Sequence, residues 1–252
     1  MRFPPTWKVL YSLATMSKAR IIDAVKTLDL KTTKSLLQAR PELLKVTDRR
    51  GWTLLHFACS NRNKDKAAVP MVEFLLDQGL EIESPIGKDD VTVLFFAVAR
   101  ARSATLVKLL LQRGAKATNA PGGGLFAAGW WGDVEILDIL IRAGSKIDVV
   151  VGITPFLACF IWKQFEAAKF LATNGANVDF QEPRSGRTAM HVAVEKEFDP
   201  ALIRWLVEHG ASPDIPDKKG ITARSRASRK RDKRFFRALG FAQKNPLLEK
   251  EG

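Results

Sequence analysis

Residues Thr53-Leu54-Leu55-His56-Phe57-Ala58 return in altered form as Thr188-Ala189-Met190-His191-Val192-Ala193. Weaker copies begin at Thr92, Thr154 and Thr222, so the five threonines advance by 39, 62, 34 and 34 residues. The step of 62 corresponds to two periods, and the glycine-rich run 121–126 stands where the missing copy would begin. A fixed period of this length predicts a solenoid, in which one supersecondary unit is stacked many times.

Each period has the composition of a helix pair. Thr53 and Thr188 can cap the first helix by accepting a backbone N–H. The second helices are mostly apolar, as in residues 134–141. Such helices cannot bury all their apolar surface within one repeat, so neighbouring repeats must pack on both sides. Glycines such as Gly175 and Gly210 then end each pair in the left-handed conformation.

A period of about 33 residues that opens with a Thr-Pro-Leu-His-like phrase resembles the ankyrin repeat. The phrase occurs here as Thr-Leu-Leu-His, Thr-Val-Leu-Phe, Thr-Pro-Phe-Leu and Thr-Ala-Met-His, and the resemblance extends from about Ser17 to Leu239. It implies an all-α solenoid of antiparallel helix pairs with projecting, hairpin-like loops. It also implies a non-enzymatic module that binds other proteins.

We predict seven repeats, the first and last of which cap the array. Their boundaries are about 17–47, 48–86, 87–117, 118–148, 149–182, 183–216 and 217–240. Residues 1–16 are expected to be an N-terminal extension that is disordered or lies before the true start at Met16, and residues 241–252 a C-terminal tail. With both ends capped, the solenoid is expected to be a monomer.

Composition favours one elongated core in an intracellular protein. The chain has 252 residues, 46% of them hydrophobic, and no apolar run long enough to span a membrane. Residues 1–15 lack a convincing signal-peptide core, so we expect a cytoplasmic location, with the nucleus or delivery into another cell as an effector left open. Cys59 and Cys159 are expected to be buried packing residues without a disulfide.

No arrangement of residues in the sequence indicates catalysis. His56 and His191 occupy the same place in the repeated phrase, where the resemblance implies hydrogen bonding between adjacent loops. His209 precedes Gly210 at a helix end. There is no nucleophile elbow, phosphate-binding glycine loop, paired carboxylate or metal-ligand spacing. We therefore expect no enzymatic activity, no cofactor and no metal.

The exposed positions of the repeats suggest where a partner binds. In repeats four and five, the residues just before the threonine and those ending the first helix are apolar: Trp130, Trp131, Val150, Val151, Ile153, Ile161 and Trp162. At the same positions, the flanking repeats contribute seven basic residues and one tryptophan: Arg49, Arg50, Trp52, Lys88, Arg100, Arg184, Arg187 and Lys196. An apolar patch with a polar rim predicts a protein partner that has an apolar segment and acidic residues. The alternative is that one or more of the three tryptophans turn inward between repeats.

The positive charge is concentrated near the C-terminus. Residues 218–237 hold ten basic residues against Asp232 alone, in a chain of net charge +13. Nine of the basic residues form a candidate polyanion site: Lys218, Lys219, Arg226, Arg229, Lys230, Arg231, Lys233, Arg234 and Arg237. The segment is either a solubilising cap or a surface that binds nucleic acid or another polyanion, and residues 229–234 could also act as a nuclear import signal.

Overall fold

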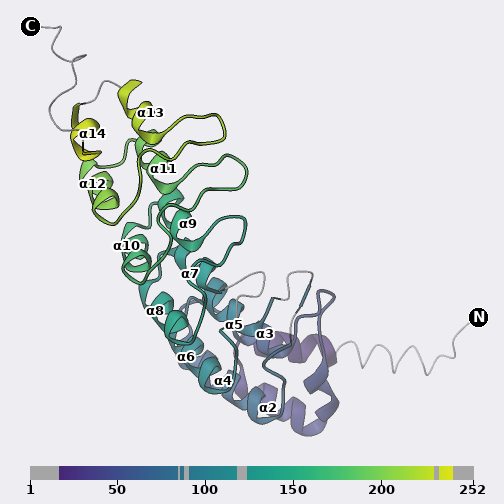
Figure 1. The fold of residues 1–252 in the computed structure, drawn as a ribbon. Helices are drawn as coiled ribbons and strands as arrows, with labels where there is room; N and C mark the ends of the chain where they lie inside the picture. Colours follow the sequence, from purple (N-terminus) through teal and green to yellow (C-terminus); the bar gives the residue numbers. More distant parts are fainter. Residues whose placement is uncertain (1–16, 85, 88–90, 118–123, 230–232, 241–252) are drawn as a thin grey trace, which may run out of the picture. The chain divides into compact units, whose positions relative to one another are not determined.

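The computed structural model describes residues 17–84, 86–87, 91–117, 124–229 and 233–240 (Figure 1). The predicted N-terminal extension, the C-terminal tail and most of the glycine-rich run therefore lie outside the described residues. The chain divides into two compact units. The N-terminal unit contains residues up to 128 together with 138–145, and the C-terminal unit contains 129–137 and the residues from 146 onward.

The N-terminal unit is built from short helices. After a helix over residues 17–26 come α2 (Leu30–Ala39), the 3-10 helix η1 (Pro41–Lys45), α3 (Leu54–Ala58), α4 (Asp65–Asp77), α5 (Val93–Phe96), the π-helical turn η2 (Ala97–Ala101) and α6 (Ala104–Gln112). α3 packs against α4 and α5, and α4 packs against α2 and α6. Two further helices, α7 (Gly124–Trp131) and α8 (Val134–Arg142), each contribute residues to both units.

The C-terminal unit consists of three helix pairs: α9 (Pro155–Ile161) with α10 (Phe165–Thr173), α11 (Ala189–Glu195) with α12 (Pro200–Glu208), and α13 (Ala223–Arg229) with α14 (Lys233–Ala238). α11 contacts both α9 and α13, while α12 contacts α14. Within this unit, the loops before α9, α11 and α13 project from the row of first helices (Figure 1). The described residues contain no strand, and the loops close through isolated bridges such as Val151–Ile153 and Pro216–Thr222. The predicted all-α helix-pair fold is confirmed.

A small buried residue recurs in the first helix of every repeat from the second onward. Alanine stands five residues after Thr53, Thr92, Thr188 and Thr222, and all four alanines are fully buried, as is Ala128 in the repeat without a threonine. After Thr154 the position is held by Cys159, whose Sγ lies 3.3 Å from the Gly129 carbonyl oxygen. Burial raises the pKa of Cys159 to about 12. Both cysteines are free and buried, as predicted.

The repeated phrase caps the first helices in two ways. The side chains of Thr92 and Thr154 accept hydrogen bonds from the backbone N–H groups three residues on. At Thr53 and Thr188, the backbone N–H of the threonine donates to Nδ1 of His56 and His191, at 3.3 and 3.2 Å. Each histidine therefore closes the first turn of its own helix, and the proton of the neutral ring is left on Nε2.

The second nitrogen of each histidine is directed at the following loop. His191 Nε2 lies 3.0 Å from the Ile221 carbonyl oxygen, which confirms the expected bond between adjacent loops. The equivalent nitrogen of His56 meets the Val91 carbonyl outside hydrogen-bond geometry. Burial lowers the pKa of His56 to about 4. Both rings are consequently neutral, structural groups near pH 7.

Carboxylates join successive repeats inside each unit. Glu83 accepts a hydrogen bond from the backbone N–H of Lys116 at 2.9 Å in the N-terminal unit. In the C-terminal unit, Asp148 and Asp179 accept from the backbone N–H groups of Asn177 and Ser212, at 3.0 and 2.9 Å. These bonds satisfy backbone donors that a loop would otherwise leave unpaired. No described helix is long and apolar enough to cross a membrane.

The small-residue position gives the first prediction. Ala193→Leu places a larger side chain where α11 packs against α9 and α13, and overpacking should lower the free energy of unfolding by about 1–3 kcal/mol. Cys159→Ala restores the residue found in the other repeats and should cost about 1 kcal/mol or less. Urea denaturation followed by circular dichroism measures both values. Equal destabilisation by the two variants would contradict the packing argument.

The buried histidine gives a pH prediction. The unfolded chain binds a proton at His56 near pH 6.5 and the folded chain only near pH 4, so protonation favours unfolding between these values. The free energy of unfolding should fall by about 3 kcal/mol as the pH is lowered from about 6.5 to 4 because of this residue. Urea denaturation at several pH values measures the free energy of unfolding, which should change less with pH for His56→Gln than for the natural chain. The same pH dependence in both proteins would show that His56 is not responsible.

Candidate protein-binding surfaces

Two tryptophans of the predicted patch are stacked in the C-terminal unit. The rings of Trp130 and Trp162 have centroids 3.9 Å apart and planes inclined by 22°. Trp130 and Trp131 are 39% and 42% exposed, while Trp162 is half-buried. Trp130 and Trp131 therefore lie at the surface. The ring of Trp130 covers part of the ring of Trp162.

A close approach of two helices brings these rings together. A Cβ added at Gly129 would lie 3.3 Å from the Pro155 carbonyl oxygen and 3.4 Å from Cys159 Sγ. These distances are shorter than most Cβ contacts, so a side chain at this position would push the end of α7 away from α9. The sequence interpretation included the tryptophans but missed Gly129, although glycine just before two aromatic residues inside a helical segment is a signal of close packing.

The aliphatic members of the patch lie at the other end of α9. Val150 is 53% exposed, and Val151 and Ile153 are half-buried in the loop that precedes the helix. The seven residues of α9 separate this loop from Trp162 by about 10 Å along the helix axis. At the Trp162 end, Lys196 Nζ donates to the Ile161 carbonyl oxygen at 3.0 Å. The aromatic pair, Ile161 and Lys196 thus form one cluster, which we call the tryptophan patch, and the valines form a separate loop surface.

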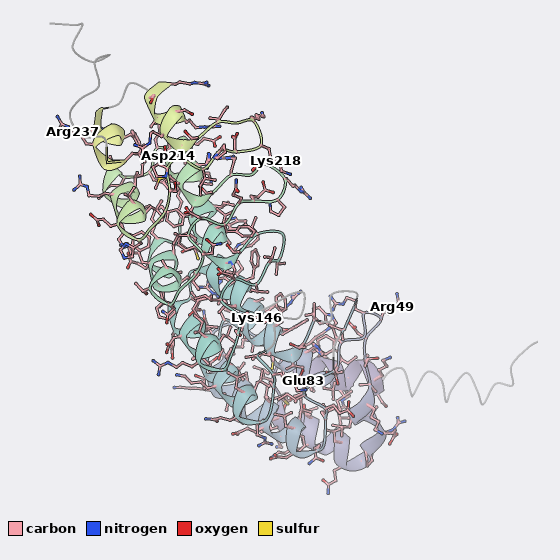
Figure 2. All side chains as sticks on the ribbon, in the orientation of Figure 1. Arg49, Glu83, Lys146, Asp214, Lys218 and Arg237 are labelled. Carbon is pink, nitrogen blue, oxygen red and sulfur yellow. The ribbon has the colours of Figure 1, made fainter. Side chains whose placement is uncertain are left out.

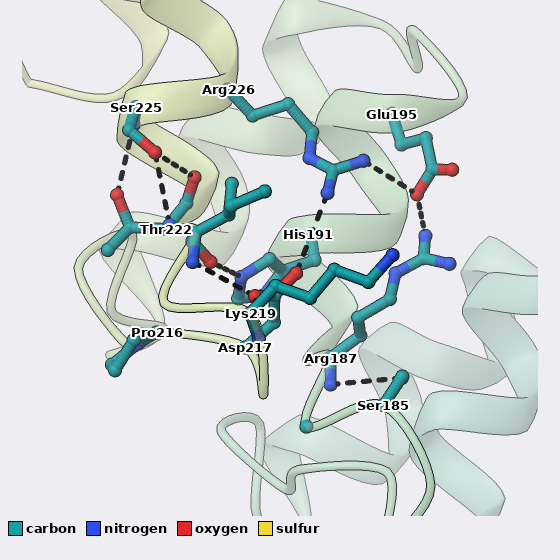
Figure 3. A network of polar contacts seen from close by, with 12 residues as sticks. Ser185, Arg187, His191, Glu195, Pro216, Asp217, Lys219, Thr222, Ser225 and Arg226 are labelled. Atoms are coloured by element: carbon teal, nitrogen blue, oxygen red, sulfur yellow. Dashed lines mark hydrogen bonds and ion pairs between the residues drawn. The ribbon is translucent and has the colours of Figure 1, made fainter.

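Arg187 belongs to a polar network instead of an open rim (Figure 3). Its guanidinium pairs with Glu195, and Arg226 from α13 reaches the same carboxylate at 3.4 Å and Asp217 at 3.6 Å. Burial, followed by the charge of Arg226, lowers the pKa of Arg187. The sequence interpretation missed Glu195 as the anion that holds the two arginines together.

Asp217 organises the loop on which this network rests. Its Oδ1 accepts the backbone N–H groups of Lys219 and Ile221, at 2.8 and 2.9 Å, and these bonds lower the pKa of Asp217. Asp48 does the same for Arg50 and Trp52 in the N-terminal unit. Of the predicted basic residues near the tryptophan patch, Arg184 and Lys196 are exposed, whereas Arg187 is half-buried.

The basic C-terminal residues are divided between solvent and internal pairs. Lys218, Lys219, Arg229, Arg234 and Arg237 are exposed, and Lys218 and Arg237 are labelled in Figure 2. Arg226 is held in the network described above. Arg224, which the sequence places at a core position, is half-buried and pairs with Asp214 and with the Leu239 carbonyl oxygen. Lys230 and Arg231 lie outside the described residues, as does the side chain of Lys233.

An open cleft lies beside the exposed arginines of α14. It has a volume of about 580 Å³, and its charged lining is mixed: Arg204, Arg234 and Arg237 with Glu197 and Asp199. Phe198 and Phe235 add apolar surface. The acidic residues reduce the attraction of this cleft for a polyanion.

The predicted basic and aromatic residues of the N-terminal unit converge on one indole. The guanidinium carbons of Arg50 and Arg100 lie 3.5 and 4.7 Å from the ring centroid of Trp52. Phe96 meets Trp52 edge-to-face, with centroids 4.6 Å apart, and Arg100 also lies 5.0 Å from the Phe96 ring. Arg49 is exposed nearby in sequence, and Lys88 lies outside the described residues. Phe96 was missed because its place in the repeat indicates only core packing.

The described part of the chain offers little for catalysis or metal binding. It contains no group of three or more His, Cys, Asp or Glu side chains that could hold a metal ion. Burial raises the pKa of both thiols and lowers the pKa of His56 and His191. The cysteines are therefore protonated and these two histidines neutral near pH 7.

The fold and these surfaces define a helical repeat protein with a packed apolar core and exposed aromatic and basic side chains. A family model described as "Ankyrin repeats (3 copies)" matches residues 21–120 and 125–240. The chain therefore belongs to the ankyrin repeat family, and the predicted all-α ankyrin-repeat solenoid is confirmed. Ankyrin repeats are protein–protein interaction modules, whose members generally lack enzymatic activity.

Relatives and solved structures agree with this assignment. The chain is 27% identical to the nuclear factor NF-kappa-B p105 subunit of Gallus gallus over 75% of its length, and 30% identical to the putative ankyrin repeat protein L92 of Acanthamoeba polyphaga mimivirus over 63%. It spans only 20% and 41% of those two proteins.

Two solved structures share the fold. The human ASB11 ankyrin repeat domain matches with a TM-score of 0.71 and 24% identity, over 87% of this chain and 95% of that one. The ankyrin repeat domain of Bcl-3, described as a unique member of the IkappaB protein family, matches with a TM-score of 0.69 and 23% identity. This match covers 87% of this chain and 96% of that one.

The arginine–glutamate network gives a further prediction. Glu195→Gln removes the carboxylate shared by Arg187 and Arg226 and should lower the free energy of unfolding by about 1 kcal/mol, more at low ionic strength than at high. Glu166→Gln breaks an isolated pair with Lys169 on α10 and should cost only a few tenths of a kcal/mol, about the value of a helical ion pair. Urea denaturation at about 0.02 and 0.5 M NaCl compares the two. An equal and salt-independent loss in both would contradict a special role for Glu195.

Proposed function

We propose that this chain is a non-enzymatic binding protein that acts as an adaptor, an inhibitor or an immunity-like factor and holds its partner on the tryptophan patch. The observation that carries the proposal is the surface position of the stacked Trp130 and Trp162 beside the exposed Trp131. Large aromatic side chains exposed together are uncommon on a surface without a partner, and tryptophan is enriched among the residues that dominate binding energy.

The geometry of the pair supports an anchoring role. Each tryptophan has only two side-chain torsions, and stacking already restricts those of Trp130 and Trp162 in the free protein. Binding therefore costs less side-chain entropy than it would at flexible residues. Lys196, held at the Ile161 carbonyl, places a positive charge next to the apolar surface. An apolar partner segment bordered by acidic residues fits this combination.

The charged residues would orient the partner and raise the rate of association. Arg184 and Lys196 in the C-terminal unit, and Arg49, Arg50 and Arg100 in the N-terminal unit, would attract an acidic partner before contact. The valines of the loop before α9 would add apolar area away from the tryptophans. A monomeric, cytoplasmic protein is the simplest form in which such a surface would act, and both properties stay predictions.

The alternative function is binding of nucleic acid or another polyanion by the basic C-terminal repeat. The exposed Lys218, Lys219, Arg229 and Arg237 favour it, since phosphates in solution can reach their charges. Of these, Lys218 also donates to the Pro183 carbonyl oxygen. The internal pairing of Arg224 and Arg226, and the acidic lining of the nearby cleft, weigh against it. We therefore prefer the protein-binding function.

Mutation of the aromatic pair tests the preferred function. Tagged protein is incubated with lysate of the source cells, with and without nuclease, and a partner retained in stoichiometric amount is purified for titration calorimetry. The triple variant Trp130→Ala, Trp131→Ala, Trp162→Ala should lose about 2–4 kcal/mol of binding energy, which is 30-fold or more in Kd. Trp205→Ala, at a half-buried tryptophan on α12 stacked on His209, is the matched control and should bind normally.

The outcome separates the two functions. Circular dichroism must first show that the triple variant is folded. A partner that survives nuclease and moderate salt but is lost by the triple variant supports the tryptophan patch. Recovery of only nuclease-sensitive material, with affinity that falls steeply with salt, would move the function to the basic C-terminal repeat.

A further inference from the structure

Arg100 is an exposed arginine that is held in place by aromatic rings. It lies in the π-helical turn η2, and its guanidinium carbon lies 4.7 Å from the Trp52 ring centroid and 5.0 Å from that of Phe96. The two rings are themselves fixed edge-to-face, and Trp52 also packs against Phe57 at 5.6 Å. Phe57 and Phe96 are buried, so this platform is part of the core of the N-terminal unit.

The charge of Arg100 is not neutralised within the described residues. Arg50, on the same indole, donates from Nε and Nη2 to Asp48 Oδ2, each at 2.9 Å. Neither Arg100 nor the exposed Arg49 forms an ion pair with any residue in the described ranges. Two guanidinium groups therefore lie over one ring, and among the described residues only that of Arg50 has an anion. A further negative group near Arg100 would relieve their mutual repulsion.

The N–H donors of Arg100 form no hydrogen bond with any of the described residues. A guanidinium has five N–H donors in one plane, arranged to pair with two oxygens of one group. Contact with two fixed rings limits the motion of the group, which reduces the entropy lost on pairing. Such a fork recognises carboxylates and phosphates, and a lysine at the same place would offer only a point charge.

We infer that Arg100, in contact with the rings of Trp52 and Phe96, binds an oxyanion carried by a side chain of the protein partner, either a carboxylate or a phosphate. The inference takes from the proposed function only that the partner is a protein. The site lies in the N-terminal unit, whereas the tryptophan patch lies in the C-terminal unit, so the two can succeed or fail separately. We assign the partner to the proteins because the single guanidinium fork of Arg100 suits one anionic side chain better than a continuous phosphate backbone.

The test uses small anions, so that no partner needs to be known. The ¹⁵N-labelled full chain is titrated with inorganic phosphate and, separately, with acetate at constant ionic strength, and the Arg100 Nε–H and Trp52 Nε1–H signals are followed by NMR. Both signals should shift in a saturable way, with a dissociation constant in the millimolar range for so small a ligand. Tighter binding of phosphate would identify the phosphorylated form as the ligand, and equal binding would identify the carboxylate as sufficient.

Four variants make the test specific. Arg100→Lys keeps the charge but loses the fork, and should weaken binding about tenfold, as should Arg100→Ala, with the Trp52 signal as the readout. Arg20→Ala removes an exposed arginine from the helix over residues 17–26 of the same unit and should leave binding unchanged. Trp130→Ala should also leave it unchanged, which separates this site from the tryptophan patch.

Other outcomes would overturn the inference. Shifts that grow linearly to about 50 mM anion, or that persist in Arg100→Ala, would show general screening instead of a site. Full binding by Arg100→Lys would show that the stacked fork is not needed. A short oligothymidylate that binds through Arg100 more tightly than an acidic peptide of equal charge would assign the site to nucleic acid.

Discussion

The close approach of consecutive first helices is the constraint on which the rest of the structure depends. Each approach is made at a fully buried small residue, alanine in most repeats and Cys159 in one. A larger side chain there would push neighbouring repeats apart, because packed interiors have no spare volume. Because consecutive repeats lie close together, His191 can reach the next loop, and Asp148 and Asp179 can accept hydrogen bonds from the backbone of the following repeat. The polar contacts between repeats are thus a consequence of the apolar packing.

The same constraint explains which features the sequence could predict. The period, the capping threonines, the buried cysteines and the bond from His191 repeat with the fold, so their positions follow from the pattern alone. The side-chain pairs of the surface do not. The Trp130–Trp162 stack depends on how closely α7 meets α9, which Gly129 determines, and the stack of Arg50 and Arg100 on Trp52 depends on rotamers that no period encodes.

A count of charged residues in the sequence did not indicate which of them are paired in the folded chain. Counting basic residues 218–237 suggests one uniform cationic surface, but Arg224 and Arg226 are tied to Asp214, Glu195 and Asp217. All three acidic residues precede residue 218, so a count over residues 218–237 does not include them. An arginine that is already paired contributes stability and loop order, whereas an exposed one contributes to recognition. Only the structure separates the two groups.

The variable surface and the packing between helices use different positions of the same repeat. The fifth residue after the threonine is always small and buried, whereas the eighth is variable: Asn61, Arg100, Trp162 and Lys196 in four of the repeats. The eighth residue follows the first helix in three of these repeats and lies in the last turn of η2 in the fourth. Exchanging it therefore alters the surface with little change in the packing between helices. An amide, a guanidinium, an indole and an ammonium can therefore occupy equivalent places on one scaffold. The order of these groups along the chain sets the chemistry of the surface, whereas the residue three positions earlier contributes to packing.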